Sequence, residues 1–453
     1  MKSILRITFV LLLTPIFPSY AALTATNIAA GSSANHSLFI KSDGSLWAMG
    51  INTEGQLGNG NMNNTNQPVE IATNGVIAAA AGYLHSLYLK SDGSLWSMGY
   101  NYYGQLGDGT SLFATNKPEQ VYPGGVTKIA AGYYHSLFLK SDGSLWGMGD
   151  NEYGQLGKSG FTGTNAPIQI TNGVIAFTAG FYHSLFVKSD GSLWGMGHNL
   201  YGQLGDGNSS NTNQPALIIP GGVTAVAAGY YHSLFLKTNG SLWGMGFNGD
   251  GQLGDGTLNN TNQPEMIYPS NVVAIAAGRW HSLFITADGS LHAMGYNVYG
   301  QLGDGSFDNY TNRPEVVYPN NVTAVAAGEY HSLFLKSDGS LWGMGENSSG
   351  QLGDGFIDSA TPYGTAISEQ IFPSPQPVLT VAASSGTNLQ ISATTGFGGN
   401  LYLLGATNIA LPASQWTEVR TNLITTRATN NLSVTLTNAV NLSGGQFYIL
   451  QSH

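Results

Sequence analysis

Short apolar segments separated by turn residues recur along most of the chain. In the copy at residues 131–149, Ala-Gly-Tyr-Tyr-His-Ser-Leu-Phe-Leu-Lys-Ser-Asp-Gly-Ser-Leu-Trp-Gly-Met-Gly, the apolar triplet Leu-Phe-Leu precedes Asp-Gly and a second apolar segment. The pattern occurs seven times, 48 to 50 residues apart, with its histidine at His36, His85, His135, His183, His232, His281 and His331. A period near 50 residues with Gly-rich turns is typical of a β-propeller.

Each repeat predicts four strands. The first is rich in alanine, as at residues 223–229, and small side chains suit the crowded centre of a ring, so it is predicted to line the channel. The second and third strands, such as residues 232–237 and 241–246, flank the dipeptide Asn239-Gly240, and the other copies have Asp-Gly there. Because these dipeptides tolerate positive φ, they predict a two-residue type I′ hairpin. Leu-Phe-Leu is apolar on both faces, as expected of a strand packed between blades. The fourth strand is predicted at the outer edge because proline cannot donate to a sheet ladder, and proline recurs there at Pro68, Pro118, Pro167, Pro215, Pro264 and Pro314.

The two ends of the chain differ from the repeat. Lys2 and Arg6, the apolar run at residues 7–17 and the small residues at 19–21 predict a secretory signal peptide over residues 1–21. The predicted propeller follows at 22–371, with a Pro-rich linker at 372–377. Short alternating segments at 378–383, 388–393, 400–404, 432–436 and 446–450 predict a β-sandwich-like module over residues 378–453. The fold class is therefore all-β: a seven-bladed β-propeller followed by a small β-sandwich-like domain. Which strand closes the ring is left open by the sequence, because the fourth strand of the seventh repeat is weak.

Composition narrows the partners and the compartment. The chain has no cysteine, which excludes a disulfide framework. It has 15 basic and 25 acidic residues, a net charge of −10, and −12 once Lys2 and Arg6 leave with the signal peptide. One repeat position supplies six of the basic residues, Lys41, Lys90, Lys140, Lys188, Lys237 and Lys336, so they are spread around the ring. Nucleic-acid binding needs a concentrated basic face and is disfavoured.

The repeat closely resembles the RCC1 (regulator of chromosome condensation) family. The shared motifs are His-Ser-Leu, Asp-Gly, Trp-x-x-Gly-x-Asn, and Gly-Gln-Leu-Gly at residues 55–58, 104–107, 154–157, 202–205, 251–254, 300–303 and 350–353. The resemblance covers about residues 24–371 and implies a seven-bladed propeller. Met49, Met98 and Met148 depart from the family by replacing its second aromatic residue, and His292 replaces the repeated tryptophan. The stretch from Tyr402 through Trp416 to Phe447-Tyr448 resembles, less specifically, C-terminal β-modules of exported bacterial repeat proteins.

The residues that invite a chemical role have simpler structural explanations. Each repeated histidine lies in its own blade, which favours a hydrogen-bonding role between strands over a metal or catalytic one. The repeated tryptophans and methionines are predicted to form core between blades. The Gly-Asp-Gly stretches lack the clustered carboxylates of a calcium loop and are interpreted as turns. No nucleophile with a base, no paired carboxylates and no phosphate loop recur, so we predict no catalytic residue, no metal and no cofactor, and hence not an enzyme.

The candidate ligand site lies in the loop between the alanine-rich strand and the histidine. Six of the seven copies carry at least one aromatic residue there, and three carry a pair. Equivalent loops form a ring on one face of a propeller, suited to stacking on a sugar or gripping a peptide. The alternative is that these aromatics only pack against the next blade. The copies diverge at Arg279-Trp280 and Glu329, and function concentrates where copies diverge. The predicted ligand-binding residues are Tyr134, Tyr182, Tyr231, Arg279, Trp280, Glu329 and Tyr330.

Three functions remain open. The leading hypothesis is an exported, monomeric, non-enzymatic binding or scaffold protein, secreted, periplasmic or on the cell surface, that binds a glycan, peptide or protein and has no transmembrane segment. The resemblance implies an alternative, nucleotide exchange on a small GTPase. The third possibility is a structural or adhesive spacer on the cell surface.

Overall fold

The computed structural model describes residues 24–111 and 113–357 and, beyond them, strands at 365–372, 379–383, 389–393, 401–406, 417–420, 432–436 and 447–452. The predicted signal peptide, residues 373–377 of the predicted linker and Trp416 lie outside these residues. The described secondary structure is all β, and no helix in it is long and apolar enough to cross a membrane. The chain divides into two compact units, one of residues 23–374 and one that includes residues 375–453.

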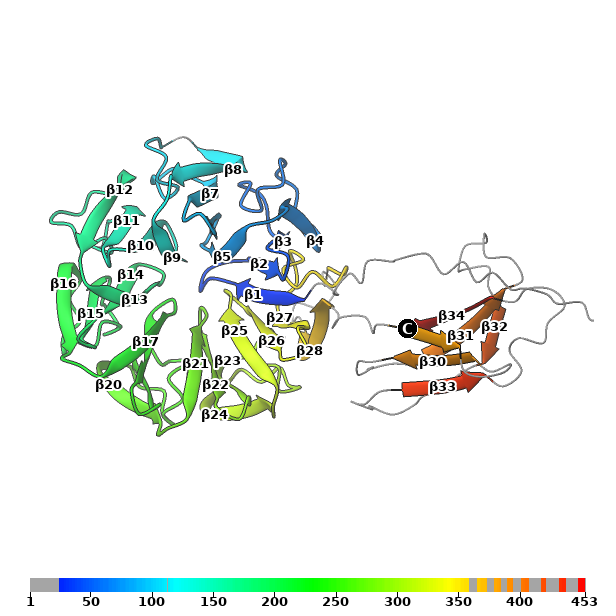
Figure 1. Ribbon diagram of the computed structural model, residues 1–453. Helices are drawn as coiled ribbons and strands as arrows, with labels where there is room; N and C mark the ends of the chain where they lie inside the picture. Colours follow the sequence, from blue (N-terminus) through cyan, green and yellow to red (C-terminus); the bar gives the residue numbers. More distant parts are fainter. Residues whose placement is uncertain are drawn as a thin grey trace, which may run out of the picture. The chain divides into compact units, whose positions relative to one another are not determined.

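The first unit is a ring of seven four-stranded antiparallel sheets, seen end-on in Figure 1. Every sheet consists of four strands that are consecutive in the chain, so one repeat forms one blade. The first strands are β1 (Ala25–Ala29), β5 (Val76–Ala81), β9 (Val126–Ala131), β13 (Val174–Ala179), β17 (Val223–Ala228), β21 (Val272–Ala277) and β25 (Val322–Ala327). The second strands are β2 (His36–Lys41), β6 (His85–Lys90), β10 (His135–Lys140), β14 (His183–Lys188), β18 (His232–Lys237), β22 (His281–Thr286) and β26 (His331–Lys336). The third strands are β3 (Leu46–Gly50), β7 (Leu95–Tyr100), β11 (Leu145–Gly149), β15 (Leu193–Gly197), β19 (Leu242–Gly246), β23 (Leu291–Tyr296) and β27 (Leu341–Gly345). The fourth strands are β4 (Thr65–Ala72), β8 (Ala114–Tyr122), β12 (Thr164–Thr171), β16 (Thr212–Ile219), β20 (Thr261–Tyr268), β24 (Tyr310–Tyr318) and β28 (Thr365–Phe372).

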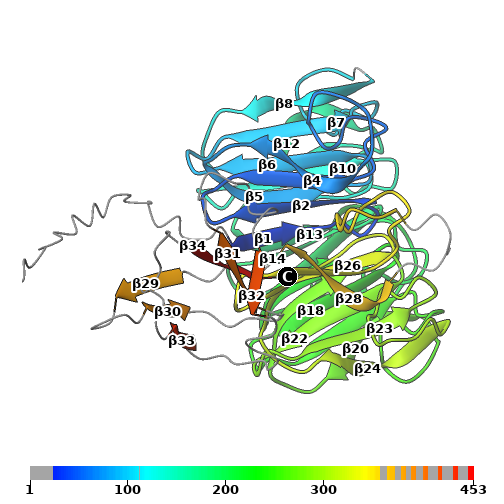
Figure 2. The same cartoon turned by 90° about the vertical axis from the view of Figure 1, so that its right-hand side faces the viewer.

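Strand order confirms the predicted radial arrangement. The alanine-rich first strands lie at the inner edge of their sheets and contact one another around the ring, with β1 meeting both β5 and β25. The proline-bearing strands lie at the outer edge. Figure 2 shows the strands of each blade running roughly along the ring axis.

The core lies between the blades. Phe39 and Met49 of the first blade are fully buried and pack with Leu333 and Leu341 of the seventh. Burying one such side chain stabilises the fold by about 1.5–3 kcal/mol, and every interface repeats the arrangement. Trp47 packs on the same cluster but is half-buried, and the Lys41 ammonium lies 3.6 Å from the centre of one of its rings. The methionines are thus core, whereas the tryptophans cover its outer edge.

The hairpin between the second and third strands differs from the prediction. In the first blade the Gly44 amide donates to the Lys41 carbonyl at 2.9 Å, and the Lys41 amide donates to the Ser45 carbonyl at 3.0 Å. Gly44 has φ of 78°, but among the described non-glycine residues only Asn271 and Asn321 have positive φ. The loop is therefore a three-residue type I turn closed by a glycine bulge, and the predicted two-residue type I′ turn is wrong. Asp43 Oδ1 accepts from the Ser45 amide at 2.9 Å, which holds the turn.

The seven repeated histidines connect neighbouring blades. Each Nε2 lies 2.7–3.0 Å from the hydroxyl of the serine that follows the histidine of the next blade, as in His135 and Ser184. The serine hydroxyl donates to a glutamine carbonyl, for example Ser184 to Gln155 at 2.8 Å. Because that hydroxyl has one proton, it accepts from the histidine, which is therefore protonated on Nε2. The predicted hydrogen-bonding role is confirmed, and it acts between blades.

The ring closes between the first and seventh blades without sharing a strand. The His331–Ser37 pair, at 2.9 Å, completes the circle of histidine–serine contacts. The Ala25 amide donates to the Gly339 carbonyl at 3.2 Å, and the Gly355 amide donates to the Asn66 carbonyl at 2.8 Å. Closure therefore reuses the same contacts as the other blade interfaces.

The sixth blade replaces two residues together. Where the other blades pair a lysine with tryptophan, it has Thr286 and His292. The His292 ring stacks on Phe284 with ring centres 4.5 Å apart, and its Nε2 lies 3.4 Å from the Thr286 hydroxyl. A smaller ring and a shorter polar side chain thus replace the lysine–tryptophan pair.

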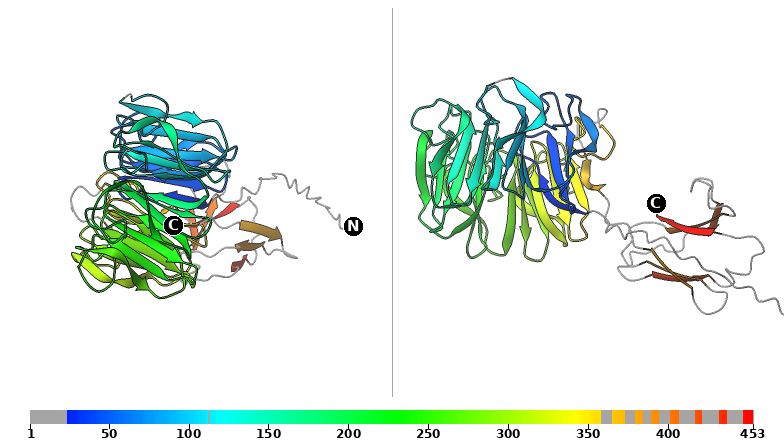
Figure 3. Two further views of the ribbon diagram at one scale, coloured as in Figure 1. Left: turned by 90° about the vertical axis from the view of Figure 1, so that its left-hand side faces the viewer. Right: turned by 45° about the horizontal axis from the view of Figure 1, so that its top comes forward.

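The second unit contains two three-stranded antiparallel sheets, visible in the right-hand view of Figure 3. One has the order β29 (Leu379–Ala383), β30 (Leu389–Ala393), β33 (Leu432–Leu436). The other has the order β32 (Thr417–Arg420), β31 (Leu401–Ala406), β34 (Phe447–Ser452). The strand at 417–420 was not among those expected from the sequence.

Candidate functional site

Two sets of loops share one end of the ring. In each antiparallel blade the loop between the first and second strands lies at the same end as the loop between the third and fourth. We call this end the tyrosine face, formed by loops such as residues 82–84 and 101–111 of the second blade. The opposite end carries the Ser-Asp-Gly turns. The candidate ligand-binding residues all belong to the tyrosine face.

An arc of stacked side chains crosses from blade to blade on this face. Tyr83, Tyr133, Phe181 and Tyr230, the inner arc, follow the glycine that ends each first strand. Their ring centres are 4.3, 4.1 and 3.5 Å apart in succession. The Arg279 guanidinium continues the arc 4.6 Å from the centre of the Tyr230 ring. These residues therefore pack against the next blade, as in the alternative interpretation, and Phe181 is buried within the arc.

A second arc lies outside the first. Tyr134, Tyr182, Tyr231, Trp280 and Tyr330, the outer arc, were predicted as ligand contacts and are all half-buried. Each packs against a ring from the loop between the third and fourth strands: Tyr103, Tyr153, Tyr201, Phe247 and Tyr299, with ring centres 4.5–5.2 Å apart. Sequence reasoning missed this third set of rings. The signal was the tyrosine that recurs in four of the seven third-to-fourth-strand loops, two residues after the asparagine; Phe247 instead directly precedes its asparagine.

The tyrosine phenols stay protonated. Burial raises the pKa of Tyr134 to about 12 and raises the pKa of Tyr133 and Tyr182 further. At neutral pH each phenol therefore offers one donor proton and one acceptor oxygen beside an apolar ring. Such groups suit a partner that is flat and partly polar.

The inner arc has no aromatic residue in the sixth and seventh blades, where Arg279 and Glu329 take its position. Arg279 and Glu329 form an ion pair, and Glu329 also accepts from Asn35 Nδ2 at 2.7 Å. Only 7 % of Glu329 is exposed. Next to this pair, burial raises the pKa of Glu346. The cation and anion that mark the divergent blades thus neutralise each other across one blade interface.

Buried amides hold the loops between the third and fourth strands in place. Asn101 is buried; its Oδ1 accepts from the Leu106 amide at 3.0 Å, and its Nδ2 donates to Asp108 at 3.1 Å. Gln105 Oε1 accepts from the Tyr103 amide at 3.1 Å. The other blades repeat most of these contacts. The loops are therefore built as rigid supports for the rings, and the Gly-Asp-Gly stretches are turns, as expected.

Exposed apolar side chains gather on the same face. Among the described residues, ten of the seventeen large hydrophobic side chains that are exposed lie in the loops between third and fourth strands: Met62, Tyr102, Tyr103, Phe113, Phe161, Leu200, Leu258, Phe307, Phe356 and Ile357. The other seven lie in strands. Within the described residues, none lies in a turn of the opposite end. Ile77, Ile175 and Val273 are exposed near the opposite end, at the start of first strands, so the difference between the two ends concerns their loops.

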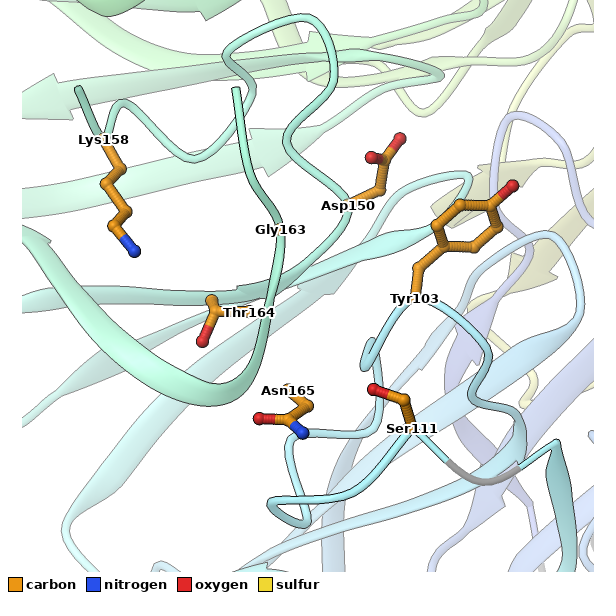
Figure 4. A pocket seen from close by; sticks show the side chains of 7 residues that line it. All are labelled: Tyr103, Ser111, Asp150, Lys158, Gly163, Thr164 and Asn165. Carbon is orange, nitrogen blue, oxygen red and sulfur yellow. The ribbon is translucent and has the colours of Figure 1, made fainter. Parts of the chain in front are cut away.

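Two shallow grooves open at equivalent places between blades. The first, of about 450 Å³, is lined by Tyr103, Ser111, Asp150, Lys158, Gly163, Thr164 and Asn165, and is shown in Figure 4. The second, of about 410 Å³, is lined by Leu200, Tyr201, Ser209, Asn260, Thr261, Asn262 and Glu265. Both combine a tyrosine with serine, threonine and asparagine. Burial raises the pKa of Asp150 in the first groove.

The described part of the chain contains no cluster of three or more histidine or acidic side chains that could hold a metal. Burial lowers the pKa of six of the repeated histidines to about 3 and that of His183 also well below its usual value, so all seven are neutral near pH 7. Their Nε2 atoms are engaged in the hydrogen bonds between blades.

Comparison with known families matches this geometry. The model of the RCC1-like domain matches residues 14–268, and the RCC1 repeat matches residues 272–301 and 322–351 and, in a second model, 288–335. The chain belongs to the RCC1-like family. No curated protein sequence matches it.

Solved RCC1-like propellers share the fold. Human WBSCR16 is 23% identical with a TM-score of 0.64, and the match covers 75% of this chain and 96% of that one. Prp20p of Saccharomyces cerevisiae, described with its binding to Gsp1p and histones, is 22% identical with a TM-score of 0.61, covering 79% and 87%. The same yeast protein bound to Kap60 gives 21% identity, a TM-score of 0.61, and coverage of 83% and 89%. At these identities the likeness establishes the fold.

On this RCC1-like ring the seven predicted ligand residues lie on one face but in two groups. Tyr134, Tyr182, Tyr231, Trp280 and Tyr330 form the outer arc. Arg279 and Glu329 pair with each other between the sixth and seventh blades. Whether any of them touches a ligand stays a prediction.

Proposed function

We propose that this RCC1-like chain is an exported, non-catalytic binding module whose tyrosine face docks a glycan, peptide or protein partner. The observation that carries the proposal is the asymmetry of the ring: the exposed apolar loop residues gather at the end that also holds the aromatic arcs. The long loops at this end provide the room for these side chains, but loop length alone does not require that they be apolar and exposed. Exposed aromatic and apolar side chains that cluster on one face are typical of interaction surfaces.

The chemistry of the face supports a partner that is both flat and polar. Half-buried tyrosines held by their neighbours lose little conformational freedom on binding, and their phenols supply hydrogen bonds. The rigid loops around Asn101 and its equivalents reduce the entropy lost on association further. The predicted signal peptide supports a partner outside the cytoplasm.

A matched pair of leucine substitutions in the fourth blade tests the face. Leu200, 61 % exposed, lies on the tyrosine face, and Leu217, 48 % exposed, lies on the outer strand β16. Full-length mature protein is screened on glycan arrays and against surface and secreted proteins, and the partner found is titrated with Leu200→Asp and Leu217→Asp. We expect Leu200→Asp to weaken binding at least tenfold and Leu217→Asp to bind like the wild type. Equal binding by both variants, or loss only in Leu217→Asp, would show that the face is assigned wrongly.

Family membership supplies one alternative, nucleotide exchange on a small GTPase. It is tested by the release of a fluorescent guanine nucleotide from a loaded GTPase on addition of the mature chain. Clear acceleration would replace the proposed binding role with an exchange role.

A further inference from the structure

We propose that the two grooves are equivalent carbohydrate subsites, each taking a neutral hydroxyl-rich sugar unit, so that the ring binds a glycan chain bivalently. The inference rests on the proposed binding function and specifies the ligand class. It starts from one sequence position, the fourth residue after Gly-Gln-Leu-Gly. That position holds Ser111 and Ser209 at the two grooves, and Met62, Phe161, Leu258, Phe307 and Ile357 in the other blades.

The serine distinguishes these two grooves from the same position in the other blades. In the other five blades the same position carries a large apolar side chain that is 39–54 % exposed at the rim. A serine removes that bulk and leaves a hydroxyl in its place. Four blades have a tyrosine in the same loop, two residues after its asparagine: Tyr103, Tyr153, Tyr201 and Tyr299. Only the blades of Tyr103 and Tyr201 also have the serine.

The floor of each groove is fixed across the blade interface. The Asn165 carbonyl accepts from the Gly109 amide at 2.8 Å, and Asn165 Nδ2 donates to the Gly109 carbonyl at 3.0 Å. Asn262 and Gly207 make the same two bonds at 2.9 and 3.0 Å. These bonds use the amide nitrogen, so the asparagine Oδ1 keeps both lone pairs for a ligand. The groove is thus preorganised.

The available groups suit a sugar. A pyranose has an apolar face that stacks on an aromatic ring, and its hydroxyls both donate and accept hydrogen bonds. Each groove offers a tyrosine ring, a serine hydroxyl with no hydrogen-bond partner among the described residues, and a free amide oxygen. Tyr103 itself is 37 % exposed and is fixed from behind by Tyr134, with ring centres 4.5 Å apart. Figure 4 shows Ser111 and Asn165 side by side beneath Tyr103.

Charge favours a neutral sugar as the unit that both grooves share. Each groove has one acidic side chain, Asp150 in the first and Glu265 in the second, and only the first has a basic one, Lys158. A ligand that depended on a basic group of the protein would therefore distinguish the two, and the acid lies at a different position in each groove. Neutral hydroxyl groups are recognised by the residue types that the grooves have in common.

The repeat itself supplies substitutions that the fold accepts. Full-length mature protein is screened on an array of neutral oligosaccharides of glucose, mannose, galactose and N-acetylglucosamine, and the best ligand is titrated by calorimetry. We expect two sites per chain for a short oligosaccharide, one site in Ser111→Phe or in Ser209→Leu, and none in the double variant, with unchanged thermal melting. For the corresponding polymer, either single variant should lower the apparent affinity on the order of 100-fold, because bivalent attachment is lost.

A gain-of-site variant makes the test symmetrical. Phe161→Ser combined with Ser159→Gly restores the Gly-x-Ser spacing of Gly109 and Ser111 beside Tyr153 and the Thr212-Asn213 segment of the next blade, and we expect a third site per chain. Absence of binding to every neutral oligosaccharide, unchanged stoichiometry in the serine variants, or no third site in this double variant would overturn the inference. If glycans fail while a protein partner is lost in Leu200→Asp but not in Leu217→Asp, the proposed function stands and only the carbohydrate subsites fail.

Discussion

His331 Nε2 in the last blade lies 2.9 Å from the hydroxyl of Ser37 in the first, and this hydrogen bond joins residues 294 positions apart in the chain. The same hydroxyl donates to the Gln351 carbonyl at 2.7 Å. Ring closure is therefore chemically identical to the contact between any two neighbouring blades, such as His135 with Ser184.

We expect the serines at these interfaces to contribute equally to the free energy of unfolding at the ring closure and between the other blades. Ser37→Ala leaves a buried histidine N–H and a carbonyl without partners, which costs about 1–3 kcal/mol in the free energy of unfolding. Ser184→Ala is the matched control between consecutive blades. Both values are measured by denaturant unfolding of the mature chain. A loss confined to Ser184→Ala would mean that the ring is open between the first and seventh blades.

The buried histidines make the ring sensitive to acid. Their pKa in the folded state is about 3 for six of them and well below the usual value for His183, whereas in the unfolded chain it returns to about 6.5. Between the folded and unfolded values the unfolded chain binds more protons, so stability is highest above about pH 6.5 and falls as the pH decreases. Because several histidines titrate together on unfolding, the loss of stability with falling pH is expected to be steep. Asp150 and Glu346, whose pKa is raised by burial, act in the opposite sense.

Unfolding free energies measured from pH 7 to pH 4 check this expectation. A steep loss of stability below pH 6 is predicted, with a smaller slope in a variant that carries His135→Gln. A flat profile down to pH 4 would contradict the neutral hydrogen-bonded state of the histidines.

The Arg279–Glu329 ion pair predicts that Arg279→Ala lowers the stability of the fold. If Arg279 served only as a ligand contact, its replacement by alanine would leave the melting temperature nearly unchanged. Because Glu329 is buried, removal of Arg279 leaves an unpaired carboxylate, and we expect a loss on the order of 2 kcal/mol. Adding Glu329→Gln should restore most of it. The two variants are compared by thermal and denaturant unfolding, and equal stability of both would show that the pair contributes little.

The substitutions of the sixth blade form a testable pair. Thr286→Lys together with His292→Trp recreates the arrangement of Lys41 over Trp47. We expect the double variant to be at least as stable as the wild type, and each single variant to be less stable by about 0.5–1 kcal/mol, the size of a cation–π contact. A double-mutant cycle measures the coupling. Additive effects would mean that the two positions do not depend on each other.

Much of the architecture was predictable because the same sequence pattern occurs in seven copies. Alanine in the first strand, Leu-Phe-Leu in the second and proline in the fourth each identify a radial position, and the structure confirms all three. The hairpin was misassigned because Asp-Gly also suits a type I turn followed by a bulge, and the choice depends on whether Ser42 belongs to the strand or to the loop. The dipeptide alone does not decide that.

The site was predictable only in part. The aromatic pairs were visible because they adjoin the conserved pattern of each repeat. Their partners, such as Tyr103, come from a loop some thirty residues away in the sequence, brought to the same end by the antiparallel order of four strands. The Arg279–Glu329 pair joins two blades, and the two residues are 50 positions apart in the sequence. The sequence shows only that each of them departs from the repeat, which does not indicate that they are in contact.

Hydrogen–deuterium exchange with and without the bound partner tests the central claim most directly. The account predicts protection in the tyrosine-face loops at residues 82–84, 101–111, 132–134, 181–182, 198–201 and 230–231. It also predicts no change in the opposite turns at residues 42–44, 91–93, 141–143 and 189–191. Protection of the Ser-Asp-Gly turns with unchanged exchange on the tyrosine face would contradict it.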